Sequence, residues 1–126
     1  MDAPLVLVVE DNPSVSGLIG ALLSELGYGH DVETDGKQAL RRIQKEKPAL
    51  VVLDMRLPGL DGLQVVRELR RSKSTAGIPI IGVTGYTHAM TRDDAIKVGC
   101  NAFFEKPFEL KEFRACVSEL LSGSER

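Results

Sequence analysis

The chain has 126 residues, of which 43% are hydrophobic and 27% charged, and its 16 Lys and Arg residues nearly balance 18 Asp and Glu residues. This length fits one domain over residues 1–126, and the composition excludes a disordered chain. The balanced charge and the absence of Trp argue against a dedicated nucleic-acid binder.

Five short apolar runs alternate with five segments whose apolar residues recur at spacings of three and four. In chain order, strands are predicted at residues 5–9, 30–34, 49–53, 78–83 and 102–104, and helices at about residues 13–26, 39–47, 63–73, 91–98 and 110–121. The second strand carries charges and is typical of an exposed edge, whereas the first and third have the unbroken apolar sequence of buried strands. We expect the core at about residues 4–121 and a polar tail at 122–126.

This alternation predicts an α/β fold, because parallel strands need crossover connections that helices provide. We therefore expect a doubly wound sheet of five parallel strands with helices on both faces. Such sheets place their functional sites beyond the carboxyl ends of the strands.

The two cysteines and the termini carry little functional signal. Cys100 and Cys116 form neither a disulfide framework nor a zinc motif, and they are typical of reduced thiols inside the cell. The apolar runs are far shorter than the roughly 20 residues of a membrane span. The N-terminus lacks the basic region of a secretion signal. We therefore expect a cytoplasmic protein without membrane insertion.

Polar residues of complementary chemistry stand at the carboxyl ends of four strands. They are Glu10 and Asp11 after the first strand, Asp54 after the third, Thr84 after the fourth and Lys106 after the fifth. Each alone fits a turn, a cap or a solvated surface. Together, three carboxylates at one edge would repel each other, and a hard divalent cation such as Mg²⁺ relieves that repulsion. A lysine and a hydroxyl beside them suit a phosphoryl group.

The segments that carry these residues resemble the receiver domains of two-component response regulators, over roughly residues 4–121. The resemblance lies in four segments: Val8–Asn12, Leu53–Gly62, Gly82–Gly85 and Phe104–Phe108. It implies a flavodoxin-like sheet of order 2-1-3-4-5. It also implies a stand-alone receiver that fills the chain, so that the signal leaves through a partner protein or a domain outside this chain.

The resemblance assigns the phosphoacceptor and the metal ligands. Asp54 takes a phosphoryl group from a phosphohistidine of a histidine kinase or histidine phosphotransfer protein and becomes an aspartyl phosphate. Glu10, Asp11, Asp54 and the backbone carbonyl of Arg56 hold Mg²⁺, or Mn²⁺ in its place. The domain thus assists its own phosphorylation and is not an enzyme with a separate substrate.

The resemblance also assigns the residues that respond to the phosphoryl group. Lys106 pairs with one phosphoryl oxygen, Thr84 donates a hydrogen bond to another, and Phe103 rotates inward behind Thr84. The Lys106–Pro107 bond is expected to be cis. The output surface is the fourth helix, fifth strand and fifth helix, here residues 91–98 and 102–121. The phosphodonor is expected to dock near the first helix.

Some positions depart from the common family pattern or vary within it. Glu10 stands where Asp is commoner, and Phe103 lacks the hydroxyl of a tyrosine found in some relatives. Arg56 and Tyr86 occupy the variable positions two residues after the phosphoacceptor and the switch threonine. We expect this bulky pair to hinder the attacking water and to lengthen the lifetime of the aspartyl phosphate.

Two alternatives stay open. One is a receiver-like binding module that acts without phosphorylation, although such modules usually lack the acceptor, an acid or the lysine. The other is a receiver excised from a larger response regulator or hybrid kinase. A phosphate-binding Gly-x-x-x-x-Gly-Lys-Ser/Thr loop is absent, which argues against an NTPase. An aspartate phosphatase would need a second acid where Arg56 stands. We expect no direct contact with nucleic acid.

Overall fold

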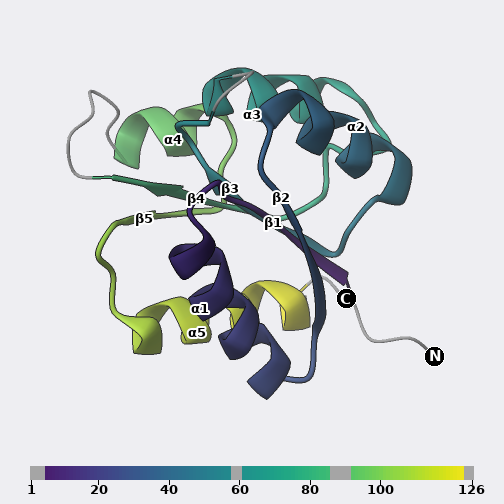
Figure 1. Cartoon of the computed structure of the whole chain (residues 1–126). Coiled ribbons are helices and arrows are strands. Elements are labelled where there is room, and N and C mark those ends of the chain that lie inside the picture. Colours follow the sequence, from purple (N-terminus) through teal and green to yellow (C-terminus); the bar gives the residue numbers. More distant parts are fainter. Residues whose placement is uncertain (1–4, 58–60, 86–91, 124–126) are drawn as a thin grey trace.

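A computed structural model describes residues 5–57, 61–85 and 92–123 of the chain. Within them, five parallel strands form one sheet of order β2-β1-β3-β4-β5 (Figure 1). The strands are β1 (Leu5–Val9), β2 (Gly29–Glu33), β3 (Leu50–Asp54), β4 (Ile80–Thr84) and β5 (Ala102–Glu105). The predicted doubly wound sheet and its strand order are confirmed.

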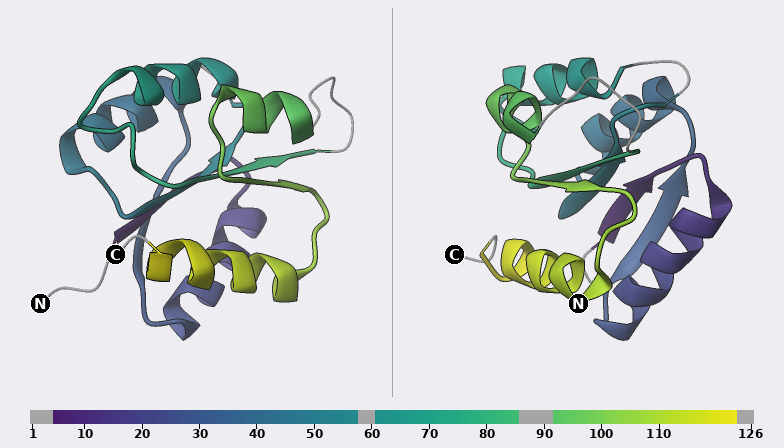
Figure 2. Two further views of the ribbon diagram at one scale, coloured as in Figure 1. Left: turned by 180° about the vertical axis from the view of Figure 1, so that it is seen from behind. Right: turned by 90° about the vertical axis from the view of Figure 1, so that its left-hand side faces the viewer.

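Five helices cover the two faces of this sheet. They are α1 (Pro13–Glu25), α2 (Gly36–Glu46), α3 (Gly62–Arg71), α4 (Arg92–Val98) and α5 (Leu110–Gly123). Figures 1 and 2 show α1 and α5 on one face and α2, α3 and α4 on the other. No helix in the described ranges is long and apolar enough to cross a membrane.

The helices bury their apolar stripes against both faces of the sheet, which gives the domain two apolar clusters. The cluster under α2, α3 and α4 includes Ile43, Val65, Leu69, Ala95 and Phe103. The cluster under α1 and α5 includes Ile19, Leu23, Phe113, Val117 and Leu121. The three central strands are covered on both faces, as their unbroken apolar sequences predicted, whereas the edge strand β2 is largely exposed.

A few residues take roles that the spacing of apolar residues in the sequence does not reveal. Asp35, predicted as part of a turn, caps α2 by accepting hydrogen bonds from two backbone N–H groups. Helix α5 continues to Gly123, into the segment predicted as a polar tail, because Leu121 packs against the core and holds the last turn. Cys116, predicted as a core residue, is only half-buried on α5.

Arg70, at the end of α3, connects the loops that lead into β4 and β5. Its guanidinium donates hydrogen bonds to the carbonyl oxygen of Gly99 at 3.0 and 2.8 Å, to that of Ile78 at 2.7 Å and to that of Ala76 at 2.9 Å. It also donates to Oδ1 of Asn101 at 3.0 Å. The sequence indicated only a charge suited to a helix end, and the structure shows a half-buried clamp at the amino edge of the sheet.

We expect Arg70→Ala to lower the free energy of unfolding by about 2–3 kcal/mol, because several carbonyls lose a charged donor. Urea unfolding followed by circular dichroism measures this. The neighbouring Arg71→Ala is a matched control, since that side chain is 73% exposed and forms an ion pair with Glu68 on the helix surface. Its expected loss is below about 1 kcal/mol. An equal loss of unfolding free energy in the two variants would show that the hydrogen bonds of Arg70 do not stabilise the fold.

Candidate functional site

Backbone hydrogen bonds continue the sheet past its strand ends and fix the residues that follow them. The N–H of Glu10 donates to the carbonyl of Glu33 at 2.9 Å, directly after β1. At the other side, the N–H of Lys106 donates to the carbonyl of Thr84 at 2.7 Å. Asp54 ends β3 in register with Val83 of β4. The site residues predicted from four strand ends are therefore mounted on one rigid edge.

Three of these residues form an acidic cluster. Glu10, Asp11 and Asp54 each offer a carboxylate oxygen, and these oxygens lie within 4.8 Å of one another. Glu10 is 2% and Asp54 6% exposed, whereas Asp11 is open to solvent. Buried carboxylates this close destabilise each other unless a positive charge joins them.

Lys106 supplies part of that charge. Its Nζ lies 2.7 Å from Oε1 of Glu10 and 3.3 Å from Oδ2 of Asp54. Three ionised carboxylates and one ammonium sum to −3 + 1 = −2, which matches the charge of a divalent cation. The donor set is all oxygen, as Mg²⁺ prefers, so the residues present fit such an ion.

The pKa values of the cluster follow from the same geometry. Burial raises the pKa of Glu10, and the charge of Asp54 acts in the same direction, while the hydrogen bond from Lys106 opposes them. Burial alone would lower the pKa of Lys106. The hydrogen bond to Glu10 and the two negative charges outweigh burial, so the pKa of Lys106 is raised.

The loop after β3 is held close to the strand end. The backbone N–H of Arg56 donates to Oδ1 of Asp54 at 2.9 Å, which orients the carboxylate. The N–H of Gly62 donates to the carbonyl of Met55 at 3.3 Å. A Cβ at Gly62 would lie 2.6 Å from the Cα of Met55, so only glycine permits this approach. The carbonyl of Arg56, predicted as a metal ligand, belongs to this loop.

Gly62→Ala is expected to push α3 away from β3 and to lower the free energy of unfolding by about 1–3 kcal/mol. Thermal and urea unfolding measure the loss. Gly17→Ala is a suitable control, because nothing lies within 4 Å of a Cβ at that helical position. Alanine there should be neutral or raise stability by up to about 1 kcal/mol. A tolerated Gly62→Ala would contradict the close approach.

Thr84 and Phe103 lie on neighbouring strands but are not register partners, since Thr84 pairs with Glu105 and Phe103 with Gly82. The Thr84 side chain is 0% exposed, and its Oγ1 has no hydrogen-bond partner in the described part of the chain. An unpaired buried hydroxyl costs about 1–3 kcal/mol, so a ligand oxygen at this edge would stabilise it. Phe103 is buried in the core cluster under α2, α3 and α4. Phe103 is 2% exposed here, and its predicted rotation behind Thr84 on phosphorylation stays a prediction.

Two further predictions fall on this region. The Lys106–Pro107 peptide bond is cis, as expected. Of the bulky pair predicted to shield the phosphoryl group, Arg56 is exposed at the site, and Tyr86 lies outside the described residues. The effect of this pair on phosphoryl lifetime stays a prediction.

Sequence reasoning identified Asn12 only as a helix cap, and the structure gives it a second role. Its Oδ1 accepts hydrogen bonds from the backbone N–H groups of Ser14 and Val15. Its own N–H donates to Oε2 of Glu10 at 3.1 Å, which orients the carboxylate that Lys106 contacts at its other oxygen. The signal was present in the sequence, since a cap residue directly follows the two acids.

An aromatic group anchors the loop that carries Lys106, and sequence reasoning also missed it. The ring centroids of Phe104 and Phe108 lie 5.6 Å apart, and Phe113 stacks against Phe108 at 5.0 Å. Phe104 and Phe113 meet edge to face at 5.4 Å. These three residues flank Lys106 closely in sequence, so the clustering of Phe residues there could have indicated it.

The chain matches the response regulator receiver domain family over residues 6–118. The alkaline phosphatase synthesis transcriptional regulatory protein PhoP of Bacillus subtilis (strain 168) is 35% identical over 95% of this chain and 49% of PhoP. The transcriptional regulatory protein HprR of Escherichia coli (strain K12) is 36% identical over 89% of this chain and 49% of HprR. The chain thus spans about half the length of the curated relatives it matches.

Solved structures of receiver domains have the same fold as this chain. The receiver domain of the sensor histidine kinase PA1611 from Pseudomonas aeruginosa PAO1 has a TM-score of 0.84 and 32% identity, covering 95% of this chain and 98% of that one, and it holds magnesium in its active site cleft. The receiver domain of the Francisella response regulator 1452 has a TM-score of 0.86 and 27% identity, covering 96% and 98%. Because the family match includes every strand end that carries the acids, the threonine and the lysine, this chain belongs to the response regulator receiver domains of two-component signalling.

Proposed function

We propose that this domain is a phosphorylation-dependent switch in which Asp54 accepts a phosphoryl group from a phosphohistidine. The observation that carries this proposal is the buried Asp54 carboxylate, which lies beside two further acids and 3.3 Å from Lys106. A carboxylate oxygen of Asp54 attacks the phosphorus, and the P–N bond breaks. Its electron pair returns to the imidazole nitrogen of the donor, and an acyl phosphate forms on Asp54.

Glu10, Asp11, Asp54 and the carbonyl of Arg56 would hold Mg²⁺, with Mn²⁺ as a substitute of similar ligand preference. When bound, the ion offsets negative charge on the transferring phosphoryl group. The acidic cluster and the magnesium found in the PA1611 receiver domain support this assignment. The protein's own part is to hold the carboxylates in place, through the N–H groups of Asn12 and Arg56.

Lys106 and Thr84 would then distinguish the phosphorylated state. The ammonium of Lys106 moves part of its pairing from the carboxylates to a phosphoryl oxygen, and the unpaired hydroxyl of Thr84 gains an acceptor. A population change from 1:99 to 99:1 requires about 5.5 kcal/mol. Contacts present only with the phosphoryl group are the source of that difference, and Phe103 behind Thr84 transmits it by packing.

The signal would leave through α4, β5 and α5, which include Phe103 and adjoin the Lys106 loop. The phosphodonor, a histidine kinase or a histidine phosphotransfer protein, would dock beside Asp11 at the start of α1. The domain is thus a phosphoacceptor that assists its own modification. The half-length match to transcriptional regulators favours a second possibility, in which the domain controls an output domain of the same protein.

Incubation with acetyl phosphate tests the proposal without a cognate kinase. With Mg²⁺, intact-mass spectrometry should show one added phosphoryl group, which hydroxylamine removes as expected for an acyl phosphate. With EDTA in place of Mg²⁺, the mass should stay unchanged. No mass increase in either condition would favour a binding module that acts without phosphorylation.

A further inference from the structure

Helices α2 and α3 contact each other on one face of the sheet and concentrate positive charge there (Figure 1). Together they hold seven basic and two acidic side chains, a net charge of +5, so the rest of a chain whose net charge is −2 carries −7. The expectation of no contact with nucleic acid used only the charge of the whole chain. That charge averages two unlike surfaces.

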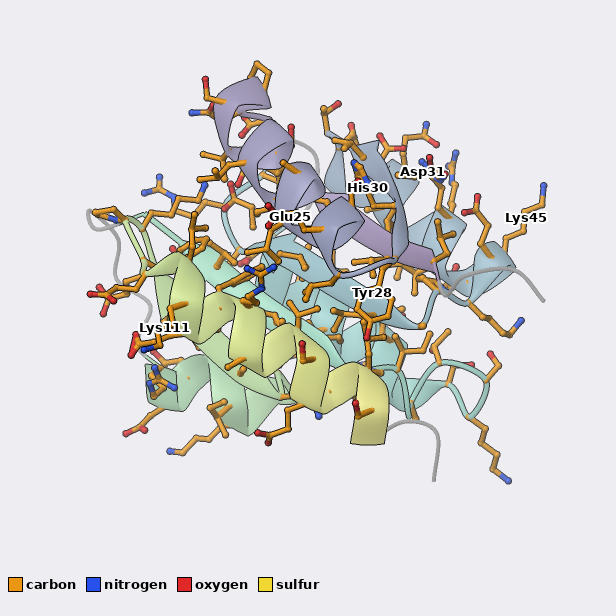
Figure 3. The ribbon with its side chains drawn as sticks, turned by 90° about the horizontal axis from the view of Figure 1, so that it is seen from below. Glu25, Tyr28, His30, Asp31, Lys45 and Lys111 are labelled. Atoms are coloured by element: carbon orange, nitrogen blue, oxygen red, sulfur yellow. The ribbon has the colours of Figure 1, made fainter. Side chains whose placement is uncertain are left out.

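The side of these helices that faces away from the sheet is lined by cations, and we call it the basic face. It consists of six exposed side chains, Lys37, Arg41 and Lys45 on α2, Arg67 and Arg71 on α3, and Lys73 just after α3. Residues four apart lie on one side of a helix, and the buried Ala39 and Ile43 occupy the opposite side of α2. Figure 3 shows Lys45 projecting from the domain on the side opposite to Lys111 of α5.

Most cations of the basic face are not neutralised within the fold. No ion pair in the described part of the chain involves Lys37, Arg41, Lys45, Arg67 or Lys73. The two acids of these helices, Glu46 and Glu68, are already paired with Arg42 and Arg71. Like charges four residues apart on a helix repel each other. An anion bound across the face would relieve that repulsion.

The composition of the basic face excludes several kinds of partner. The large hydrophobic residues exposed in the described ranges all lie outside α2 and α3. Helices that bind a membrane surface insert an apolar side, and protein interfaces centre on apolar or aromatic side chains and are depleted in lysine. Neither α2 nor α3 contains an aromatic residue on which the bases of a single strand could stack. A partner that needs only positive charge remains.

The phosphate backbone of a duplex fits a surface of this kind. Duplex DNA carries one negative charge per about 1.7 Å of its axis. Cations four residues apart lie about 6 Å apart along α2, and packed helices lie about 8–10 Å apart, so several cations can contact phosphates at the same time. Phosphate contacts carry no sequence information. We infer that the basic face binds duplex DNA through its backbone, without reading its sequence.

Fluorescence anisotropy with a labelled duplex of about 20 base pairs tests the inference, with EDTA present so that Mg²⁺ does not compete. The expected Kd is on the order of 10 µM at about 50 mM salt, and log K should fall against log salt with a slope of about −4, as for four or five phosphate contacts. Two duplexes of unrelated sequence should bind within about threefold of each other. The absence of binding at about 1 mM protein, a flat salt dependence or a strong preference for one duplex would overturn the inference.

Neutralising two lysines tests the location of the contact. Lys37→Gln combined with Lys45→Gln should weaken binding about tenfold or more at about 50 mM salt and bring the salt slope about two closer to zero. Lys97→Gln combined with Lys111→Gln is the matched control, because it makes the same charge change at exposed lysines on α4 and α5. Equal weakening by the two double variants would show that the basic face is not the binding surface.

Two other polyanions test the assignment to a duplex. Extended poly-glutamate carries one charge per about 3.3 Å, which is half the density of duplex DNA, so it should bind at least about tenfold more weakly. Vesicles that contain phosphatidylserine should also bind more weakly than the duplex. Poly-glutamate that binds as tightly as the duplex would reassign the face to an acidic protein segment, and tighter binding to the vesicles would reassign it to a membrane surface.

The same variants separate this inference from the proposed function. Lys37 and Lys45 lie outside the acidic site, so their double variant should take up a phosphoryl group from acetyl phosphate with Mg²⁺ as the wild type does. Loss of duplex binding with normal uptake supports the basic face as a separate surface. A wild type that binds the duplex but takes up no phosphoryl group would reject the phosphoacceptor proposal and leave the basic face intact.

Discussion

Asp54→Asn is expected to abolish phosphoryl uptake and to make the domain more stable when no Mg²⁺ is present. The amide is not a nucleophile, so the mass increase with acetyl phosphate should disappear. The variant also changes the charge of the cluster from −2 to −1. Relief of this repulsion should raise the free energy of unfolding by about 1–2 kcal/mol, measured by urea unfolding in EDTA.

Added Mg²⁺ should reverse the order of stability. A ligand that binds only the folded state, at a hundred times its Kd, stabilises that state by about 2.7 kcal/mol, which exceeds the advantage expected for Asp54→Asn without Mg²⁺. The wild type should gain this amount, and Asp54→Asn should gain much less because it offers one carboxylate fewer. Asp61→Asn is a control that removes an exposed carboxylate just outside the cluster, where it caps α3. Equal Mg²⁺ effects on the wild type and Asp54→Asn would show that Asp54 is not a ligand.

Lys106→Met should have the largest effect on stability. It leaves the buried carboxylates of Glu10 and Asp54 without their ammonium, and removing one partner of such a group costs about 2–4 kcal/mol near neutral pH. Urea unfolding in EDTA at pH 7.5 measures the loss. Lys111→Met on α5 is the control, because that lysine is exposed and its substitution should cost below about 1 kcal/mol.

The deficit of Lys106→Met should shrink as the pH falls. The pKa of Glu10 is raised in the folded state, mainly by burial, so the folded protein binds the proton more readily than the unfolded chain. Its contribution therefore favours folding at acid pH and is lost as the pH rises through the folded pKa. Lys106 lowers the pKa of Glu10, so this pKa is higher in Lys106→Met. The free energy of unfolding of the variant should therefore depend more strongly on pH than that of the wild type. A deficit that is the same at pH 7.5 and at pH 5 would contradict this account.

The sequence predicted the fold because its signals were local. Unbroken apolar strands and helical spacings need only neighbouring residues to be recognised, and the parallel sheet then follows from the need for crossovers. The site was predictable once the sheet was known to be parallel, because the carboxyl ends of parallel strands lie at one edge of the sheet. Glu10, Asp54 and Lys106 come from distant segments, yet the topology alone brings them together.

What the sequence did not reveal depends on side-chain conformations and on packing between segments. Arg70 looked like a helix-end charge, and its hydrogen bonds to Gly99 and Ile78 exist only once α3 packs against the loops before β4 and β5. The second role of Asn12 depends on the rotamer of Glu10. Likewise, the end of α5 is set by the packing of Leu121 rather than by the polarity of the residues that follow it.

The position of the Arg70 clamp has a consequence for how the domain tolerates change. Arg70 and its partners stand before β4 and β5, while the acids and Lys106 stand after the strands, at the opposite edge of the same sheet. The clamp therefore contributes to stability at the edge of the sheet that lies away from the reactive groups. Substitutions around the clamp should shift the unfolding transition while leaving metal affinity unchanged, so the domain can be tuned to temperature without altering its chemistry.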